Sequence, residues 1–233
     1  MHRYIHGGAW RDPRNTDLNF APATEAMVGH KDIPQDRLRG FASIDYRLSG
    51  DGAQHPDHIE DVRNALAFLH QEYNISDKYI LVGHSAGGTL SFQLLMEDAA
   101  LQGRTRTPVP LPTAVIGTAG IYDLVGLNER VKRGYTDFLT AAFGDEKGWD
   151  AASPAKFAGS YKTNWPSGKL AVLASSPDDT LVDVAEVNVL ESKLLGHGVP
   201  VQTVKDLTGQ HDVVWEEGVQ TANLVAKVIS QLD

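Results

Sequence analysis

A serine flanked by glycines is the residue best suited to chemistry in this sequence of 233 residues. Residues 83–87 read GHSAG and match the pattern G-x-S-x-G. In this pattern the serine projects from a tight turn between a strand and a helix, where a larger residue at either glycine would clash. The alternative is a glycine-rich turn that only packs a helix on a strand. The pattern predicts Ser85 as the nucleophile of an acyl-transfer reaction.

A serine nucleophile needs a base, which is usually a histidine held by an acid. The chain has nine histidines, and only His197 and His211 lie well beyond Ser85. His197 stands between two glycines at an expected helix end. His211 follows the last expected strand, where a loop at the carboxyl edge of a sheet should lie, so we predict His211 as the base. The alternative is an ordinary histidine in a surface loop.

The acid is expected after the strand that precedes this one, where three aspartates compete. Asp179 lies far enough past the strand end to turn back toward His211, and Asp178 is its close rival. Asp183 is expected in the first turn of the next helix, where a carboxylate suits the helix dipole. We predict Asp179, although each of the three could instead close a turn or cap a helix.

Backbone donors for the developing oxyanion are expected near the start of the chain, where residues 6–10 read HGGAW. The glycines follow a short expected strand and let the backbone turn its N–H groups toward a reacting carbonyl. Each such donor is worth about 2.7–4 kcal/mol. Ala86, directly after the nucleophile, should supply another N–H group. The alternative for this motif is an ordinary turn. The motif residues are His6, Gly7, Gly8, Ala9 and Trp10.

A metal site is a weaker interpretation of this sequence. Residues 55–58 read HPDH and carry ligand-type side chains at close spacing, but zinc would need a further partner that the sequence does not nominate. Pro56 and the pattern after it indicate a helix amino terminus instead. The absence of cysteine excludes disulfides, thiolate metal sites and a thiol nucleophile. We therefore expect no metal and no cofactor.

Charge and hydropathy exclude two classes of partner. Lys and Arg number 21 against 30 Asp and Glu, which gives a net charge of −9 and argues against binding to nucleic acid or to an anionic membrane. No apolar run approaches the roughly 18 residues that a membrane-spanning helix needs. The start of the chain shows no signal-peptide pattern. These features lead us to expect a cytoplasmic protein.

The elements that must position these residues alternate between strand and helix. The strand-like segments are mostly apolar rather than alternating, which is typical of a parallel sheet covered on both faces. They are 1–5, 40–46, 78–82, 114–118, 169–174 and 199–204, and the helix-like segments are 56–73, 87–97, 184–195 and 213–232. Residues 122–165 break the alternation and are rich in Tyr, Phe and Trp. We expect one α/β domain over residues 1–233, with this stretch as a cap-like insertion.

With these motifs placed, the sequence resembles the α/β-hydrolase superfamily, and more closely the fungal type of the kynurenine formamidase (arylformamidase) family. The likeness runs over nearly the whole chain, and HGGAW together with GIYDL is its most specific combination. Its motifs are HGGAW at 6–10, YRLS at 46–49, HP at 55–56, GHSAG at 83–87, GIYDL at 120–124, AFG at 142–144, SP at 153–154, Asp179-x-Leu181 and Gly209-x-His211.

The resemblance implies an α/β-hydrolase fold and the hydrolysis of N-formyl-L-kynurenine to kynurenine and formate, without metal or cofactor. It assigns the triad to Ser85, Asp179 and His211, and the oxyanion donors to Gly8 and Ala9. It also suggests a homodimer. Family members usually carry some tens of residues, including early strands, before the HGG motif. Here the motif begins at residue 6, so we expect the N-terminal strands to be shortened or missing.

Aromatic residues of the motifs and of the insertion are candidates for the substrate pocket. We predict that Trp10 and Tyr122 contact the substrate, although such residues could equally form the core under the cap. Two other functions stay open. One is a general carboxylesterase for short acyl esters, which would share every catalytic residue. The other is a small-molecule receptor on a hydrolase scaffold, which would bind without turnover.

Overall fold

A six-stranded parallel sheet is the framework of the computed structural model, which describes residues 2–74 and 76–232. The strand order is β2-β1-β3-β4-β5-β6, and every neighbouring pair is parallel. The carboxyl ends of the strands therefore meet at one edge of the sheet. The strands are β1 (His2–Ile5), β2 (Phe41–Ile44), β3 (Ile80–His84), β4 (Ala114–Thr118), β5 (Leu170–Ala174) and β6 (Val201–Val204).

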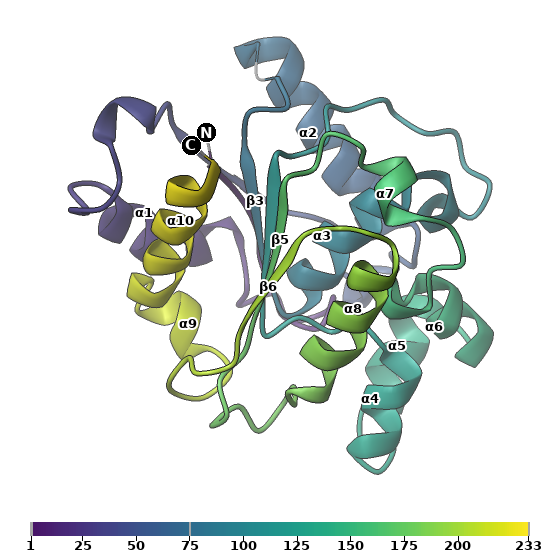
Figure 1. Ribbon diagram of the computed structural model, residues 1–233. Coiled ribbons are helices and arrows are strands. Elements are labelled where there is room, and N and C mark those ends of the chain that lie inside the picture. The colour runs from purple at the N-terminus through teal and green to yellow at the C-terminus, as the bar shows by residue number, and fades with distance from the viewer. Residues whose placement is uncertain (1, 75, 233) are drawn as a thin grey trace.

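Helices cover both faces of the sheet, which explains why the strands are mostly apolar rather than alternating (Figure 1). Leu81 and Val115 face one core, under α2 (Asp57–Tyr73), α3 (Ala86–Met96) and α8 (Ala185–Gly196). Val82 and Ile116 face the other core, under α1 (Ala21–Met27) and α10 (Val219–Leu232). The predicted parallel α/β sheet is confirmed.

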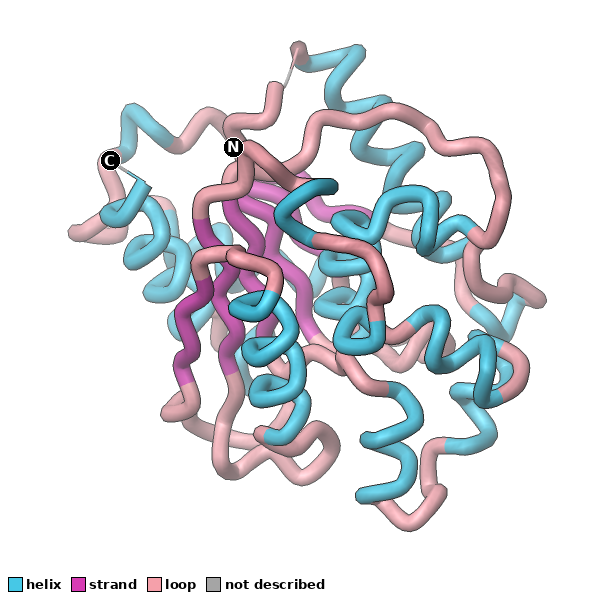
Figure 2. Tube along the Cα trace, turned by 45° about the vertical axis from the view of Figure 1, so that its right-hand side comes forward, coloured by secondary structure: helices cyan, strands magenta, loops and turns pink. Residues whose placement is uncertain are grey.

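The helix α3 follows the G-x-S-x-G turn and is buried along its whole length. It lies against β3 and β4 on one side and against α2 and α7 (Tyr161–Asn164) on others (Figure 2). A helix enclosed on all sides needs no polar face, and its sequence AGGTLSFQLLM has none. This burial fixes the direction in which the preceding turn presents its serine.

The aromatic-rich stretch 122–165 contains no strand and folds into short helices that lie beyond the edge of the sheet (Figure 2). Its buried side chains include Phe143, Trp149 and Trp165, and they belong to the same hydrophobic core as α2, α3 and α8. The insertion and the sheet therefore share one core. The helices are α4 (Leu124–Arg130), α5 (Thr136–Phe143), α6 (Glu146–Ala152) and α7.

Two features differ from the expected elements. Residues 11–39, for which no element was expected, contain α1, which packs against α10. The expected helix 213–232 is divided into α9 (Val213–Glu216) and α10. Gly218 lies between them with φ +70°, and a Cβ there would lie 2.3 Å from the backbone nitrogen of Ala23. The close approach of α1 therefore explains the break.

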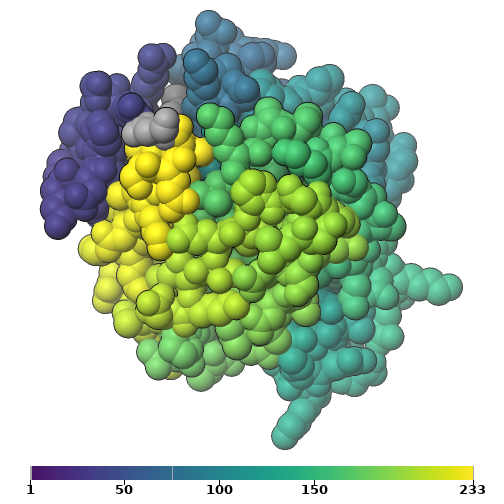
Figure 3. Space-filling model, in the orientation of Figure 1, coloured from purple at the N-terminus to yellow at the C-terminus, as the bar shows by residue number. Residues whose placement is uncertain are grey.

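The outer surface joins segments that are far apart in the sequence. The space-filling view shows α10 and α8 on the same face, with the amino-terminal segment beside α10 (Figure 3).

Among the described residues, no helix is both long enough and apolar enough to cross a membrane.

Candidate active site

The predicted nucleophile lies in a sharp turn between β3 and α3. Ser85 has φ +52° and ψ −118°, a backbone conformation that side-chain-bearing residues rarely adopt. Its amide donates to the carbonyl of Thr118 at 2.9 Å. A Cβ on Gly83 would lie 2.3 Å from the Gly87 carbonyl oxygen, and a Cβ on Gly87 would lie 2.1 Å from the Ile5 oxygen. The two glycines are therefore required by the close approach of backbone to backbone.

The predicted base and acid form a hydrogen-bonded pair. His211 Nδ1 lies 2.7 Å from Asp179 Oδ2, and the two side chains are 9% and 1% exposed. Burial alone would raise the pKa of Asp179. The hydrogen bond from His211 and the amides of Leu181 and Val182 outweigh burial and hold that pKa below its usual value. Asp179 is therefore ionised at neutral pH, and His211 Nδ1 carries a proton that leaves Nε2 free to accept one.

The rival residues have other partners. Asp178 Oδ2 accepts from the amide of Gly209 at 3.2 Å, and Asp183 pairs with Arg130 at 2.7 Å. His197 Nδ1 accepts from the amide of Tyr161 at 3.2 Å. None of the three faces the pair formed by His211 and Asp179.

A second buried histidine, His84, joins the serine turn to the loop of the predicted base. Its Nε2 donates to the carbonyl oxygen of His211 at 3.0 Å, and the two rings lie 4.7 Å apart. Burial lowers the pKa of His84 to about 3, so its ring is neutral at physiological pH. His84, the residue before Ser85, therefore holds the backbone of His211, although the two residues are 127 positions apart in the sequence.

The HGG loop presents backbone donors beside this turn. Within the described chain, the amides of Gly8, Ala9 and Ala86 have no recorded acceptor. The carbonyl of Gly7 is held from behind by the Tyr46 hydroxyl, which donates to it at 2.8 Å. A Cβ on Gly7 would lie 3.0 Å from the Ser85 Cβ. The loop can therefore approach the serine only with glycine at this position.

One cavity of about 320 Å³ brings these groups together. Its wall contains Ser85, His211, Gly8 and Ala9. Five further lining residues form an apolar surface that suits an aromatic ring: Ile121, Tyr135, Phe138, Leu181 and Val182. The remaining lining residues are polar or charged: Arg11, Asp12, Arg14, Asn15 and Asp212. A site of this composition can hold a carbonyl against the serine and an aryl group beside it.

The two aromatic residues predicted to touch the substrate lie outside this wall. Trp10 is fully buried, and its ring packs edge-on against Phe143 at 4.8 Å. Tyr122 is also fully buried and packs edge-on against Phe92 at 5.4 Å. Its hydroxyl fills the space where a Cβ of Gly120 would lie, at 2.2 Å. Both residues support the loops that form the site.

Two other aromatic residues of the insertion line the cavity, whereas Trp10 and Tyr122 do not. Tyr135 and Phe138 line it, and the Tyr135 hydroxyl donates to the carbonyl of Leu181 at 2.9 Å. Their only signal in the sequence is the aromatic enrichment of residues 122–165.

An ion cluster around the buried Glu186 connects the insertion to the segment that follows Asp179. Arg130 at the end of α4 pairs with Asp183 and with Glu186. Glu186 is fully buried and also accepts from the amides of Tyr122 and Asp123. Burial raises the pKa of Glu186 to about 7, against the opposing effect of these donors. No sequence motif predicted this ion cluster.

Among the described residues, His55 and His58 belong to no group of three ligand-type side chains close enough to share a metal ion. Burial lowers the pKa of His55 to about 3 and of His58 to about 4, and His58 Nε2 lies 3.1 Å from the Ser49 hydroxyl. Of the described residues, His84, His211 and Asp212 hold ligand-type atoms within 4.8 Å of one another. This group includes the predicted base, so it coincides with the site already described.

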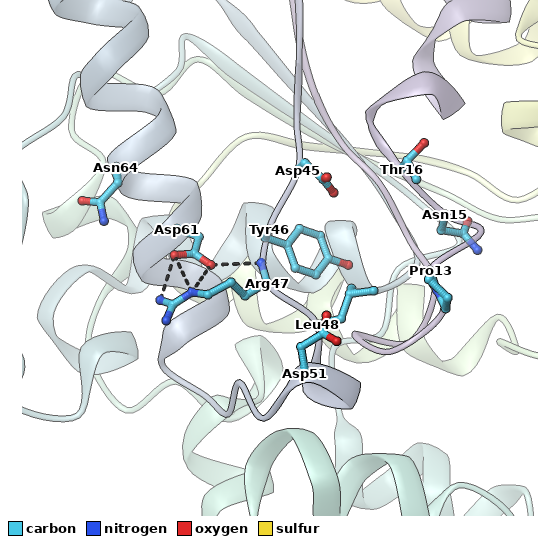
Figure 4. A pocket seen from close by; sticks show the side chains of 10 residues that line it. All are labelled: Pro13, Asn15, Thr16, Asp45, Tyr46, Arg47, Leu48, Asp51, Asp61 and Asn64. Atoms are coloured by element: carbon cyan, nitrogen blue, oxygen red, sulfur yellow. Dashed lines mark hydrogen bonds and ion pairs between the residues drawn. The ribbon is translucent and has the colours of Figure 1, made fainter.

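A second cavity, of about 640 Å³, is lined by residues of the segments 13–16 and 45–51 and by Asp61 and Asn64 of α2 (Figure 4). Arg47 crosses it and forms hydrogen bonds of 2.8–3.1 Å with both carboxylate oxygens of Asp61. Asp45 lies in the same wall and holds His6 Nε2 at 2.8 Å. No residue of the predicted triad lines this cavity.

Comparison with known proteins places the chain among hydrolases. The model of the BD-FAE family matches residues 3–194. The kynurenine formamidase avaC of Aspergillus versicolor is 40% identical, over 92% of this chain and 83% of its own length. A kynurenine formamidase-like hydrolase of Fusarium equiseti, fscH, is 37% identical over 98% of this chain and 82% of its own length.

A solved structure agrees with this fold. The carboxylesterase Cest-2923 of Lactobacillus plantarum aligns with 99% of this chain and 85% of its own, with a TM-score of 0.72 and 16% identity. At this identity the likeness concerns the fold.

Proposed function

Because the chain belongs to the kynurenine formamidase family of α/β-hydrolases, we propose that it hydrolyses N-formyl-L-kynurenine to L-kynurenine and formate. The observation that carries this proposal is the shared cavity of Ser85 and His211, with Asp179 behind the histidine and unpaired amides beside the serine. The apolar wall of that cavity suits the aryl ring of a formyl anilide.

In the first step Ser85 Oγ attacks the formyl carbon, and His211 Nε2 takes the hydroxyl proton. The carbonyl electrons move onto the oxygen, which the amides of Gly8, Ala9 and Ala86 stabilise. The C–N bond then breaks, and the proton on Nε2 passes to the aryl-amine nitrogen. L-kynurenine leaves, and the formyl group stays on Ser85 as an ester.

In the second step water attacks this formyl ester while His211 Nε2 takes a proton from the water. The C–Oγ bond breaks, the proton returns to Ser85, and formate leaves. Asp179 keeps the proton on Nδ1 in both steps and stabilises the imidazolium that forms each time. Activity should fall on acidification, because a protonated ring cannot act as the base.

The test is the release of kynurenine from N-formyl-L-kynurenine by the purified protein, beside Ser85→Ala and with a chelator present. We expect turnover that survives the chelator and falls by roughly 10⁴- to 10⁶-fold in the variant. No turnover from wild-type protein with a folded circular dichroism spectrum would overturn the proposal. Turnover that the chelator abolishes would overturn the metal-free mechanism.

The esterase fold of the Lactobacillus plantarum protein favours a second candidate, a carboxylesterase for short acyl esters. The two functions differ in their relative rates on formyl anilides and on butyryl esters. A pocket built for formyl should reject butyryl, although each added methylene changes selectivity by only about 1–3 kcal/mol. The homodimer stays a prediction, which light scattering on the purified protein would test.

A further inference from the structure

Two charged residues that line the catalytic cavity form no close ion pair within the described residues, although Asp12 lies near Arg11 and Arg14 lies near Asp212. Arg11 is exposed, and its guanidinium carbon lies 5.2 Å from the centroid of the Phe138 ring. Within the described residues, no acidic side chain is paired with it. Arg14 provides the contrast, because its guanidinium is already bound to both carboxylate oxygens of Asp12 at 2.7–3.2 Å. Arg11 is therefore the cation of this rim that is available to a ligand.

The acidic counterpart is Asp212, which follows the predicted base. It is half-buried, and its Oδ1 accepts from Trp215 Nε1 at 2.9 Å. No cation is paired with its carboxylate in the described part of the chain. The indole donor fixes the side chain and leaves the second oxygen available. The cavity lining thus carries one cation and one anion, each in contact with an aromatic residue and neither in a close ion pair within the described residues.

We propose that Arg11 binds the α-carboxylate of the substrate and Asp212 binds its α-ammonium group. This proposal rests on the proposed function, since that substrate carries a zwitterionic amino-acid group beyond its aryl ring. The cavity wall offers lining residues that suit each part of this substrate. Ser85 and His211 lie at the reacting carbonyl, the apolar residues suit the ring, and the charged residues are left for the amino-acid group.

The chemistry of each contact fits its partner. A guanidinium presents two parallel donors that match a carboxylate, and its contact with the Phe138 ring restricts its orientation before a ligand arrives. A carboxylate accepts from an ammonium group through a charge-assisted hydrogen bond. Neither group takes part in the proton transfers or bond changes of the proposed mechanism. They should therefore act on binding and change KM more than kcat.

Three substrates separate this proposal from the proposed function. N-formyl-L-kynurenine carries both charges, N-formylkynurenamine lacks the carboxylate, and 2-formamidoacetophenone lacks the whole amino-acid group. Arg11→Gln should raise KM for the first substrate by about 10- to 100-fold and leave both others unchanged. Asp212→Asn should raise KM for the first two by a similar factor and leave the third unchanged. Arg39→Gln is the control. It also removes one positive charge, but Arg39 precedes the amino-terminal end of β2, whereas the site lies at the carboxyl edge of the sheet.

The outcomes are distinct. If the wild-type protein hydrolyses none of the three formyl anilides, the proposed function fails. If it hydrolyses all three with equal KM, or if the variants change KM equally for all three, the proposed function stands and the charged subsite is overturned. Because Asp212 adjoins His211, a fall in kcat for the neutral substrate in Asp212→Asn would report damage to the base rather than loss of an ammonium contact. That result would overturn the role assigned to Asp212.

Discussion

The turn that carries Ser85 and the loop that carries Asp179 both fix a side chain at the carboxyl edge of the sheet, but different forces hold them. The serine turn depends on close packing, since added Cβ atoms at Gly83 or Gly87 would lie within 2.3 Å of backbone oxygens. The acid loop leads into α8, where Asp183 and the buried Glu186 are held by Arg130 from α4. Steric fit does not change with pH or salt, whereas an ion cluster does.

The difference has a reason in the sequence order. The serine turn joins two adjacent elements, β3 and α3, so local geometry suffices to shape it. The acid loop must meet a histidine that follows β6, the last strand, and an insertion that lies between β4 and β5. Long-range charge pairs provide that connection. The site thus combines one rigid half with one half that responds to solution conditions.

The largest expected effect is the loss of the acid. Asp179→Asn should lower kcat by about 10⁴-fold, because the amide cannot hold His211 in the required tautomer. Asp178→Asn should change kcat little, since the carboxylate of Asp178 accepts from the Gly209 amide and not from His211. Steady-state kinetics on the two variants provide the measurement. Equal losses in both would contradict the assignment of the acid.

Gly87→Ala tests the steric half. Its Cβ would lie 2.1 Å from the Ile5 carbonyl oxygen, so β1 and α3 would have to separate. We expect destabilisation of at least about 3 kcal/mol in urea unfolding, with activity lost. Gly196→Ala is the matched control, because no atom lies within 4 Å of its added Cβ. That control should be stabilising by about 0.4–1 kcal/mol. A fully active and stable Gly87→Ala would refute the steric account.

Arg130→Gln tests the electrostatic half. The change leaves Glu186 buried without its cation and releases Asp183, so the Asp179 loop should lose its connection to α4. We expect about a tenfold fall in kcat and about 1–3 kcal/mol of lost stability. Arg133→Gln breaks an exposed pair with Glu146 and should change neither quantity measurably. Indistinguishable kinetics and unfolding for the two variants would show that the cluster does not hold the loop.

The smallest effect concerns pH. The pKa of Glu186 is raised to about 7 in the folded state, above its ordinary value of 4.5. Between these values the folded state keeps a proton that the unfolded state has lost. The contribution of Glu186 to the free energy of unfolding should therefore fall as pH rises from about 4.5 to about 7 and stay constant above that. Glu186→Gln should lack this slope. Urea unfolding at pH 5 and at pH 7.5 measures it, and parallel profiles for the two proteins would contradict the assigned pKa.

The rigid half of the site was the more predictable from sequence. The serine turn and the alternation of apolar strands with helices are local patterns, and the observed elements follow them closely. The sequence favoured Asp179 with Asp178 as its close rival, because adjacent residues in a loop differ mainly in the direction of their side chains. The structure pairs His211 with the second of them.

What the sequence missed depends on contacts between distant segments. Trp10 and Tyr122 were expected at the substrate, but the packing of Phe143 and Phe92 against them places both in the core. Gly218 ends a helical pattern only because α1 approaches it. Arg130 has no local motif, since its partners lie more than fifty residues later in the chain.

The wholly parallel sheet also has a consequence for how the enzyme acquires activity. No neighbouring strands can pair by a tight hairpin, so each pairing must wait for an intervening crossover to form. His211 follows β6, and its loop reaches Ser85 only after Ala174 and Val204 have come into register. During refolding, regained catalysis should therefore lag behind regained helical circular dichroism. Turnover would then report the final docking of β6, a step that helical circular dichroism does not detect.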